Sequence, residues 1–199
     1  MNSATTTLTP ENVPWSLPYK GRVGMTCLIM SESAIFIIFV VAYLYYIGKS
    51  LTGPTPQQVL HLPILNSICL LSSSATIMLA ERSLRKGVTS RFGFWWLATI
   101  ALGGYFLFGT GAEWHHLIYE KGLTLQTNLF GTTFYSLVGL HAFHVCVGLL
   151  ALLIVMALTL AGTVKQEHAA RVEVLGLYWH FVDVVWIVVF TVVNVIRLS

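Results

Sequence analysis

Apolar residues along this chain gather in five long runs, unlike the short alternating or amphipathic segments of a soluble domain. The runs cover about residues 24–48, 63–84, 92–111, 129–161 and 174–198. A bilayer core about 30 Å thick requires roughly 20 consecutive apolar residues in a helix. The pattern therefore predicts an all-α membrane protein, a bundle of five transmembrane helices. At 1.5 Å per residue the fourth run would be about 50 Å long, so it must tilt or project beyond the membrane.

Composition supports a single domain in lipid. Of the 199 residues, 56% are hydrophobic and 10% are charged, whereas a soluble domain carries roughly a quarter charged residues. We expect a polar N-terminal arm at 1–20 and a five-helix transmembrane domain at 21–199. Residues 1–18 are rich in Thr and Pro and carry no Lys or Arg, which does not fit a cleaved signal peptide.

The distribution of Lys and Arg predicts the orientation. With five spans, one side of the membrane collects eight basic residues: Lys20, Arg22, Arg82, Arg85, Lys86, Arg91, Lys165 and Arg171. The other side has only three: Lys49, Lys121 and Arg197. The positive side is normally cytoplasmic, so we expect the N-terminus inside and the C-terminus outside. This topology also accounts for the basic excess without a nucleic-acid partner.

Five ionisable residues fall at membrane depth: Glu32, His141, His144, His180 and Asp183. His141 and His144 are three residues apart and share a helix face, as do His180 and Asp183. All five groups could meet in a small bundle. Such residues are costly in lipid and usually have a purpose. We favour a structural polar network that clamps the helices. Two alternatives remain: a proton path through Glu32 and the histidines, and a metal site, although the Glu-x-x-His repeats of di-metal bundles are missing.

Further candidates lie near the end of the third run and among the cysteines. We expect Glu113 to pair with a neighbouring helix, and His115 and His116 to be solvated interfacial residues rather than metal ligands. The three cysteines, Cys27, Cys69 and Cys146, stand alone within apolar runs, and we interpret them as buried structural residues without disulfides.

Several motifs, read in chain order, resemble subunit III of the haem–copper oxidases. The most specific is LYWHFVDVVW at 177–186. FGTTF at 130–134 and GLHAFHV at 139–145, both in the fourth run, are similar to the family's Gly-Ser-Thr-Phe and Gly-x-His-x-x-His-Val motifs. LPILNS at 62–67, Ser31-Glu32 and Ala112-Glu113 match further family positions. The chain lacks the first two of the seven spans of longer members, as shorter bacterial versions do.

The resemblance implies a non-catalytic accessory subunit of a proton-pumping terminal oxidase in the cell inner (plasma) membrane. Its partners would be subunit I, by direct helix packing, subunit II and phospholipids. Haem and copper would lie on the partner subunits, and this chain would bind no cofactor of its own. In the family the subunit stabilises the oxidase, lies near a proton-uptake entry and holds phospholipid in a cleft between helix groups.

The electron donor and two other functions stay open. EWHHLI at 113–118 looks like the quinol oxidases, whereas Ser31-Glu32 and Tyr178-Trp179 look more like the cytochrome c branch, which we favour. An accessory subunit of a nitric oxide reductase is a further alternative. The hypothesis from a different class is an autonomous membrane metalloenzyme that uses Glu32, His141, His144, His180 and Asp183.

Overall fold

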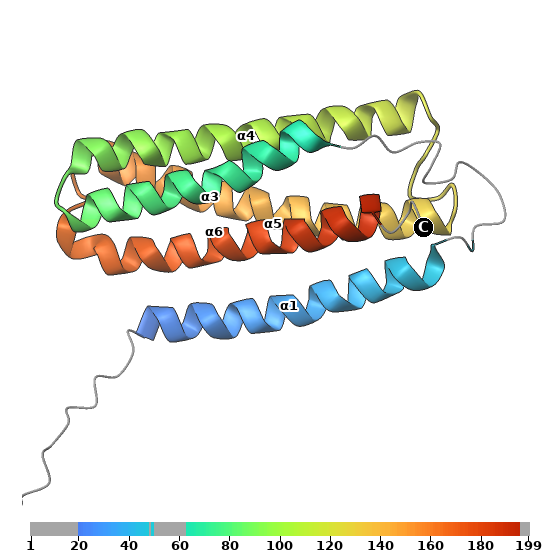
Figure 1. The fold of residues 1–199 in the computed structure, drawn as a ribbon, viewed down its shortest axis with the longest axis horizontal. Coiled ribbons are helices and arrows are strands. Elements are labelled where there is room, and N and C mark those ends of the chain that lie inside the picture. Colours follow the sequence, from blue (N-terminus) through green and yellow to red (C-terminus); the bar gives the residue numbers. More distant parts are fainter. Residues whose placement is uncertain (1–19, 48, 50–62, 196–199) are drawn as a thin grey trace, which may run out of the picture.

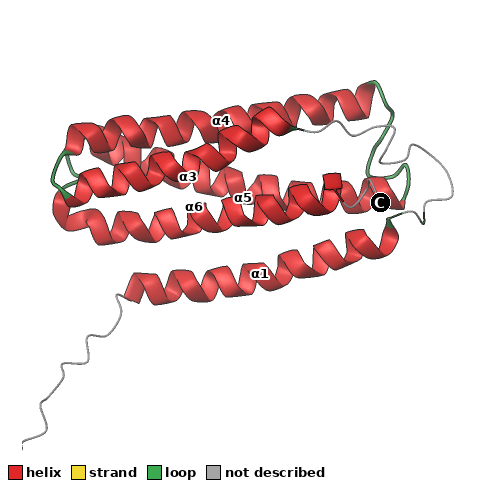
Figure 2. Ribbon diagram, in the orientation of Figure 1, coloured by secondary structure: helices red, strands yellow, loops and turns green. Residues whose placement is uncertain are grey.

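The chain forms long helices that lie side by side (Figure 1), in a computed structural model that describes residues 20–47, 49 and 63–195. The helices are α1 (Lys20–Tyr46), α3 (Ile64–Arg85), α4 (Thr89–Tyr119), α5 (Leu129–Leu160) and α6 (Ala169–Phe190). A 3₁₀ turn, Gln166–His168, precedes α6, and a π-helical turn, Thr191–Val195, follows it. The described residues contain no strand (Figure 2). Within these ranges, five helices are long and apolar enough to cross a membrane, which confirms the predicted five-helix bundle.

Successive helices run in opposite directions. The start of α1, the α3–α4 turn and the α5–α6 turn lie at the same end of the bundle, at the left in Figure 1. We call this the basic end, because it carries the residues that the sequence assigned to one side: Lys20, Arg22, Arg82, Arg85, Lys86, Arg91, Lys165 and Arg171. The opposite end holds the α4–α5 connection and the end of the π-helical turn.

The helix limits differ from the predicted runs at two places. Helix α4 continues to Tyr119 instead of ending near residue 111, because Leu117 is buried and keeps the last turns against the bundle. Helix α6 begins at Ala169, five residues before the predicted start. Its first turns carry Glu173, whose charge is paired with Arg85, so the charge does not end the helix. The predicted N-terminal arm, apart from Lys20, and residues 196–198 of the last run lie outside the described residues.

Glycines in the left-handed conformation end three of the helices. Gly87, Gly122 and Gly162 follow α3, α4 and α5 with φ of 74°, 63° and 72°. Side chains other than glycine rarely adopt such angles. After α3, the N–H of Val88 donates to the carbonyl of Ser83, a typical helix-ending bond. These turns reverse the chain sharply, so consecutive helices become antiparallel neighbours.

Helix α6 lies at the centre of the packing. In its most apolar window 61% of the residues are buried, against 11% for α1. Its Trp179 is fully buried and fills the space that Gly103 of α4 and Gly148 of α5 leave open. A Cβ at Gly103 would lie 2.8 Å from this indole ring. Small residues on the flanking helices therefore let α6 approach closely.

Helix α1 is the least embedded element. It packs mainly on α5 and α6, and Phe36 and Tyr43 are its buried residues. In Figure 1 it lies along one side of the other four helices.

The cysteines are free, as expected, but the prediction of burial is wrong for Cys27 and Cys146. Both are exposed on the bundle surface, and Cys69 is partly exposed. The apolar runs do not distinguish a core position from a lipid-facing one, because both favour the same side chains.

Candidate functional site

Glu32 of α1 and His144 of α5 form a hydrogen-bonded pair. The Oε2 of Glu32 lies 3.1 Å from the Nε2 of His144, and the other ring nitrogen, Nδ1, lies 2.8 Å from the carbonyl oxygen of Leu140. Phe36 packs against the imidazole ring at 5.0 Å between centroids. The side chain of Glu32 is 23% exposed and that of His144 is 8% exposed. The bond between them therefore joins α1 to α5 in a mostly buried setting.

The two bonds of His144 restrict the protons of the pair. A carbonyl oxygen only accepts hydrogen bonds, so Nδ1 carries a proton. The Nε2 either accepts a proton from the neutral Glu32 acid or, in the imidazolium, donates to the Glu32 carboxylate. In both states one proton lies between the two groups and the pair has no net charge. A neutral pair avoids most of the cost of charge at membrane depth.

Ser74 of α3 joins His180 and Asp183 of α6. Its hydroxyl donates to Oδ2 of Asp183, and its oxygen lies 3.0 Å from Nδ1 of His180. A hydroxyl carries one hydrogen, so with that hydrogen on Asp183 the His180 Nδ1–H is the donor to Ser74. Asp183 is 3% exposed, and its Oδ1 has no hydrogen-bond partner among the described residues. The sequence pattern brings His180 and Asp183 together as predicted from their spacing, and Ser74 is the partner that it did not indicate.

His141 of α5 is fully buried but lies apart from these two groups. Its ring packs against Trp186 and Phe106, at 5.0 Å and 5.8 Å between centroids. Neither ring nitrogen has a hydrogen-bond partner within the described chain. The structure therefore brings the predicted polar residues into separate groups, the Glu32–His144 pair and the Ser74–His180–Asp183 group, with His141 outside both.

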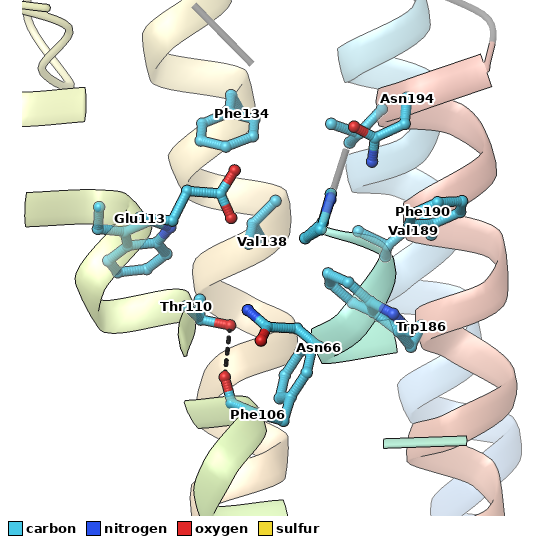
Figure 3. Close-up of a pocket in the computed structure, with 13 residues that line it drawn as sticks. Asn66, Phe106, Thr110, Glu113, Phe134, Val138, Trp186, Val189, Phe190 and Asn194 are labelled. Carbon is cyan, nitrogen blue, oxygen red and sulfur yellow. Dashed lines mark hydrogen bonds between the residues drawn. The ribbon is translucent and has the colours of Figure 1, made fainter. Parts of the chain in front are cut away.

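Glu113 of α4 lines a small, mostly apolar pocket between α3, α4, α5 and α6 (Figure 3). The pocket has a volume of about 20 Å³, room for one water molecule. Asn66 of α3 and Asn194 of the π-helical turn lie around the same space in Figure 3. Gly109 makes this arrangement possible, because a Cβ there would lie 2.2 Å from Nδ2 of Asn66. Glu113 thus lines a space between helices, and its pairing with a residue of a neighbouring helix stays a prediction.

The α3–α6 interface contains polar contacts that the sequence reasoning missed. The indole N–H groups of Trp179 and Trp186 donate to the hydroxyls of Ser73 and Ser67, at 2.8 Å and 3.0 Å. The sequence does contain a signal for these contacts. The tryptophans stand seven residues apart, about two helical turns, and Ser67 and Ser73 of α3 stand six residues apart.

A second missed contact involves Glu173 of α6. Its carboxylate forms ion pairs with Arg85 of α3 and Arg22 of α1, the latter at 3.5 Å. These contacts lie at the basic end and connect three helices. The charges are visible in the sequence, but their partners depend on how the helices pack.

The metal-site alternative finds little geometric support in this arrangement. Across residues 20–47, 49 and 63–195, no group of three or more His, Cys, Asp or Glu side chains is placed to hold a metal ion. His144 faces Glu32, and His180 faces Ser74. Near the end of α4, Nδ1 of His116 lies 2.9 Å from a carboxylate oxygen of Glu120, and His115 packs on Tyr119.

Comparisons with known proteins agree with the motifs. The family model described as "Cytochrome c oxidase subunit III" matches residues 18–196. Cytochrome c oxidase subunit 3 of Synechocystis sp. is 41% identical over 85% of this chain and 73% of its own length. The subunit of the same name from Alkalihalophilus pseudofirmus is 34% identical over 86% of this chain and 84% of its own. Cytochrome bo(3) ubiquinol oxidase subunit 3 of Pseudomonas aeruginosa is 34% identical over 85% and 82%. On this evidence the chain belongs to the cytochrome c oxidase subunit III family.

Proposed function

We propose that this chain is the accessory subunit III of a proton-pumping haem–copper terminal oxidase, in which oxygen reduction takes place on partner subunits. The observation that carries the proposal is the family match over residues 18–196. The site geometry supports the non-catalytic part. The deep histidines are each held by a different neighbour, and they do not converge on a common point as the ligands of a haem or copper centre would.

In this proposal the buried polar groups act as clamps between helices. The Glu32–His144 pair holds α1 on α5, and the Ser74 group holds α3 on α6. A well-clamped bundle can stabilise the catalytic subunit that packs beside it. A proton path through Glu32 remains an alternative, because the pair already shares one proton.

Phospholipid is part of the proposal. An apolar groove of about 230 Å³ lies between α1 and α6, lined among others by Phe36, Ile37 and Phe181. Its size and apolar walls suit an acyl chain. We assign the partners as subunits I and II, and the location as the cell inner (plasma) membrane with the basic end inside.

Cytochrome c is the electron donor that we favour, because two of the relatives named above are cytochrome c oxidase subunits, one of them at 41% identity. A quinol oxidase is the second candidate, supported by the Pseudomonas aeruginosa relative at 34% identity.

The test is affinity purification of the tagged chain in mild detergent from its own membranes, with an untagged strain as control. We expect co-purification of a larger haem-bearing chain and oxygen consumption with reduced cytochrome c. Oxygen consumption with ubiquinol alone would assign the chain to a quinol oxidase, and nitric oxide consumption to a nitric oxide reductase. A chain that purifies alone, without haem-bearing partners, would contradict the proposal, and bound metal on it would favour a metalloenzyme.

Orientation has a separate test. In a background without the three native cysteines, a single cysteine replaces either Thr163, at the basic end, or Lys121, at the other end. A membrane-impermeant maleimide added to intact spheroplasts should label Lys121→Cys and spare Thr163→Cys. The reverse labelling would overturn the predicted orientation.

A further inference from the structure

A groove at the basic end lies where α3 turns into α4, outside every site described above. Its volume is about 780 Å³, within the range of small-molecule sites. Arg82, Lys86 and Arg91 line its polar side, and Leu79, Phe94 and Trp95 line its apolar side. The groove is thus basic on one side and apolar on the other.

The three cations of the groove are unpaired within the described chain. Among the described residues no salt bridge involves Arg82, Lys86 or Arg91, and no acidic residue lines the groove. Arg85, one residue from Lys86, behaves differently, because Glu173 neutralises it. Three positive charges therefore face an open space without a counter-charge from the residues that the structure describes.

The backbone adds to this positive potential. Helix α4 begins at Thr89, and its N-cap residue, Val88, makes no side-chain capping bond. The first N–H groups of a helix have no partner inside the helix, and they favour an anion. Ser90 and Arg91, in this first turn, both line the groove.

The membrane topology explains why basic residues gather at this end, but the helix dipoles favour only part of this set. Arg82 and Lys86 lie at the carboxyl end of α3, where cations offset the helix dipole. Arg91 lies in the first turn of α4, where the dipole disfavours a cation. A bound anion between the three side chains would account for Arg91 as well.

The apolar side indicates what kind of anion fits. Phe94 is 66% exposed, next to the cations and at the end of a membrane-crossing helix. A free phosphate would leave this surface unused, whereas a phospholipid places its phosphate beside acyl chains. A zwitterionic lipid also brings a positive group, for which the groove offers no carboxylate.

We propose that the α3–α4 groove binds an anionic phospholipid, with its phosphate between Arg82, Lys86 and Arg91 and an acyl chain along Phe94 and Trp95. Basic pockets between helices bind anionic headgroups in this way. The inference uses residues of this chain alone, and the groove is on a different side from the apolar α1–α6 groove. It does not depend on the proposed function, since the groove would bind the same lipid if the partners were different.

The experiment uses the chain with whatever subunits co-purify, stripped of lipid by detergent exchange and titrated with phosphatidylglycerol or phosphatidylcholine under native mass spectrometry. The triple variant Arg82→Gln/Lys86→Gln/Arg91→Gln removes the groove charges. The control variant Lys20→Gln/Lys165→Gln/Arg171→Gln removes the same charge from exposed positions at the same end. The groove variant removes three basic residues from the headgroup site, so it should lose on the order of a hundredfold in phosphatidylglycerol affinity. The control should lose less than about threefold, and phosphatidylcholine should bind weakly to all.

A single substitution covers the case in which the triple variant does not assemble. Ser90→Glu places a carboxylate at the start of α4, where the helix dipole tolerates it, so we expect it to fold and to weaken phosphatidylglycerol binding. A phospholipid with a brominated acyl chain should also quench the fluorescence of Trp95. The quenching should therefore be smaller in Trp95→Phe than in the unmodified protein.

Three results would overturn the proposal. The first is an equal loss in the groove and control variants, which would mean a non-specific charge effect. The second is equal binding of phosphatidylcholine. The third is displacement of the lipid by millimolar inorganic phosphate, with no quenching of Trp95, which would mean a site for the free anion.

Discussion

The indole N–H of Trp179 donates a 2.8 Å hydrogen bond to Oγ of Ser73, across the interface between α6 and α3. Both side chains are fully buried. The bond satisfies the polar atom of a tryptophan whose ring fills the space between α4 and α5, so this one residue contacts α3, α4 and α5. The surroundings of Trp179 are therefore the most sensitive part of the packing.

Gly103→Ala should destabilise the bundle. Its new Cβ would lie 2.8 Å from Cη2 and 2.9 Å from Cζ2 of Trp179, and overpacking of this kind costs roughly 1–3 kcal/mol. The control is Gly104→Ala, since nothing lies within 4 Å of a Cβ there. Thermal unfolding followed by intrinsic fluorescence should show a lower Tm for Gly103→Ala alone. Equal Tm values for the two variants would contradict the packing around Trp179.

Ser74→Ala should weaken the contact between α3 and α6. The change leaves the His180 ring and the buried Asp183 carboxyl without their shared partner, and an unsatisfied buried polar group costs roughly 1–3 kcal/mol. Ser72→Ala removes a hydroxyl that bonds only the carbonyl of Cys69 in its own helix, so it should have little effect. The measurement is the denaturant midpoint of the purified protein in detergent.

Replacement of Glu32 distinguishes hydrogen bonding from charge. Glu32→Gln can donate from its amide to Nε2 of His144, so we expect the bundle and its assembly to remain nearly intact. Glu32→Leu leaves Nε2 unpaired and should cost roughly 1–3 kcal/mol. Assembly is measured as the amount of this chain that co-purifies with its partners. If Glu32→Gln abolished assembly, the charge itself would be required.

His141→Leu should be tolerated, because no hydrogen bond from this ring is lost within the described chain. Its contacts with Phe106 and Trp186 are made by ring faces and edges, and an apolar leucine side chain can partly replace these contacts. We expect a change in Tm of only a few degrees. A loss as large as that of Ser74→Ala would mean that water or a partner subunit satisfies the ring nitrogens.

The sequence predicted the large-scale features well. The five apolar runs became five helices, and the limits of α5, from Leu129 to Leu160, agree with the prediction within one residue. Asn128 caps this helix by accepting from the N–H of Gly131, so a local signal marks its start. The predictions for α4 and α6 were less accurate, because the apolar runs stop short of Glu113 and Glu173 and the helices include both. Glu173 is paired with arginines of α3 and α1, and the pattern of a single chain does not contain that information.

The sequence predicted which polar residues share a helix face, but not which residues of other helices they contact. The spacing of His180 and Asp183 placed them on one face, yet Ser74 lies 106 and 109 residues away along the chain. His141 and His144 also share spacing, but only His144 faces Glu32, because α1 and α6 cover different sides of α5. Hydropathy places residues at a membrane depth, and sequence spacing shows which of them share a helix face, whereas the choice of partner depends on how whole helices rotate against one another.

The contacts of α1 with α5 and α6 form only late in the synthesis of this protein. Glu32 and His144 are 112 residues apart, and Arg22 and Glu173 are 151 apart. At roughly 5–20 residues per second, the first helix enters the membrane on the order of ten seconds before its partners leave the ribosome. During that interval the Glu32 side chain has no histidine beside it, so the insertion machinery, lipid or water must accommodate an unpaired acid until the last two helices arrive.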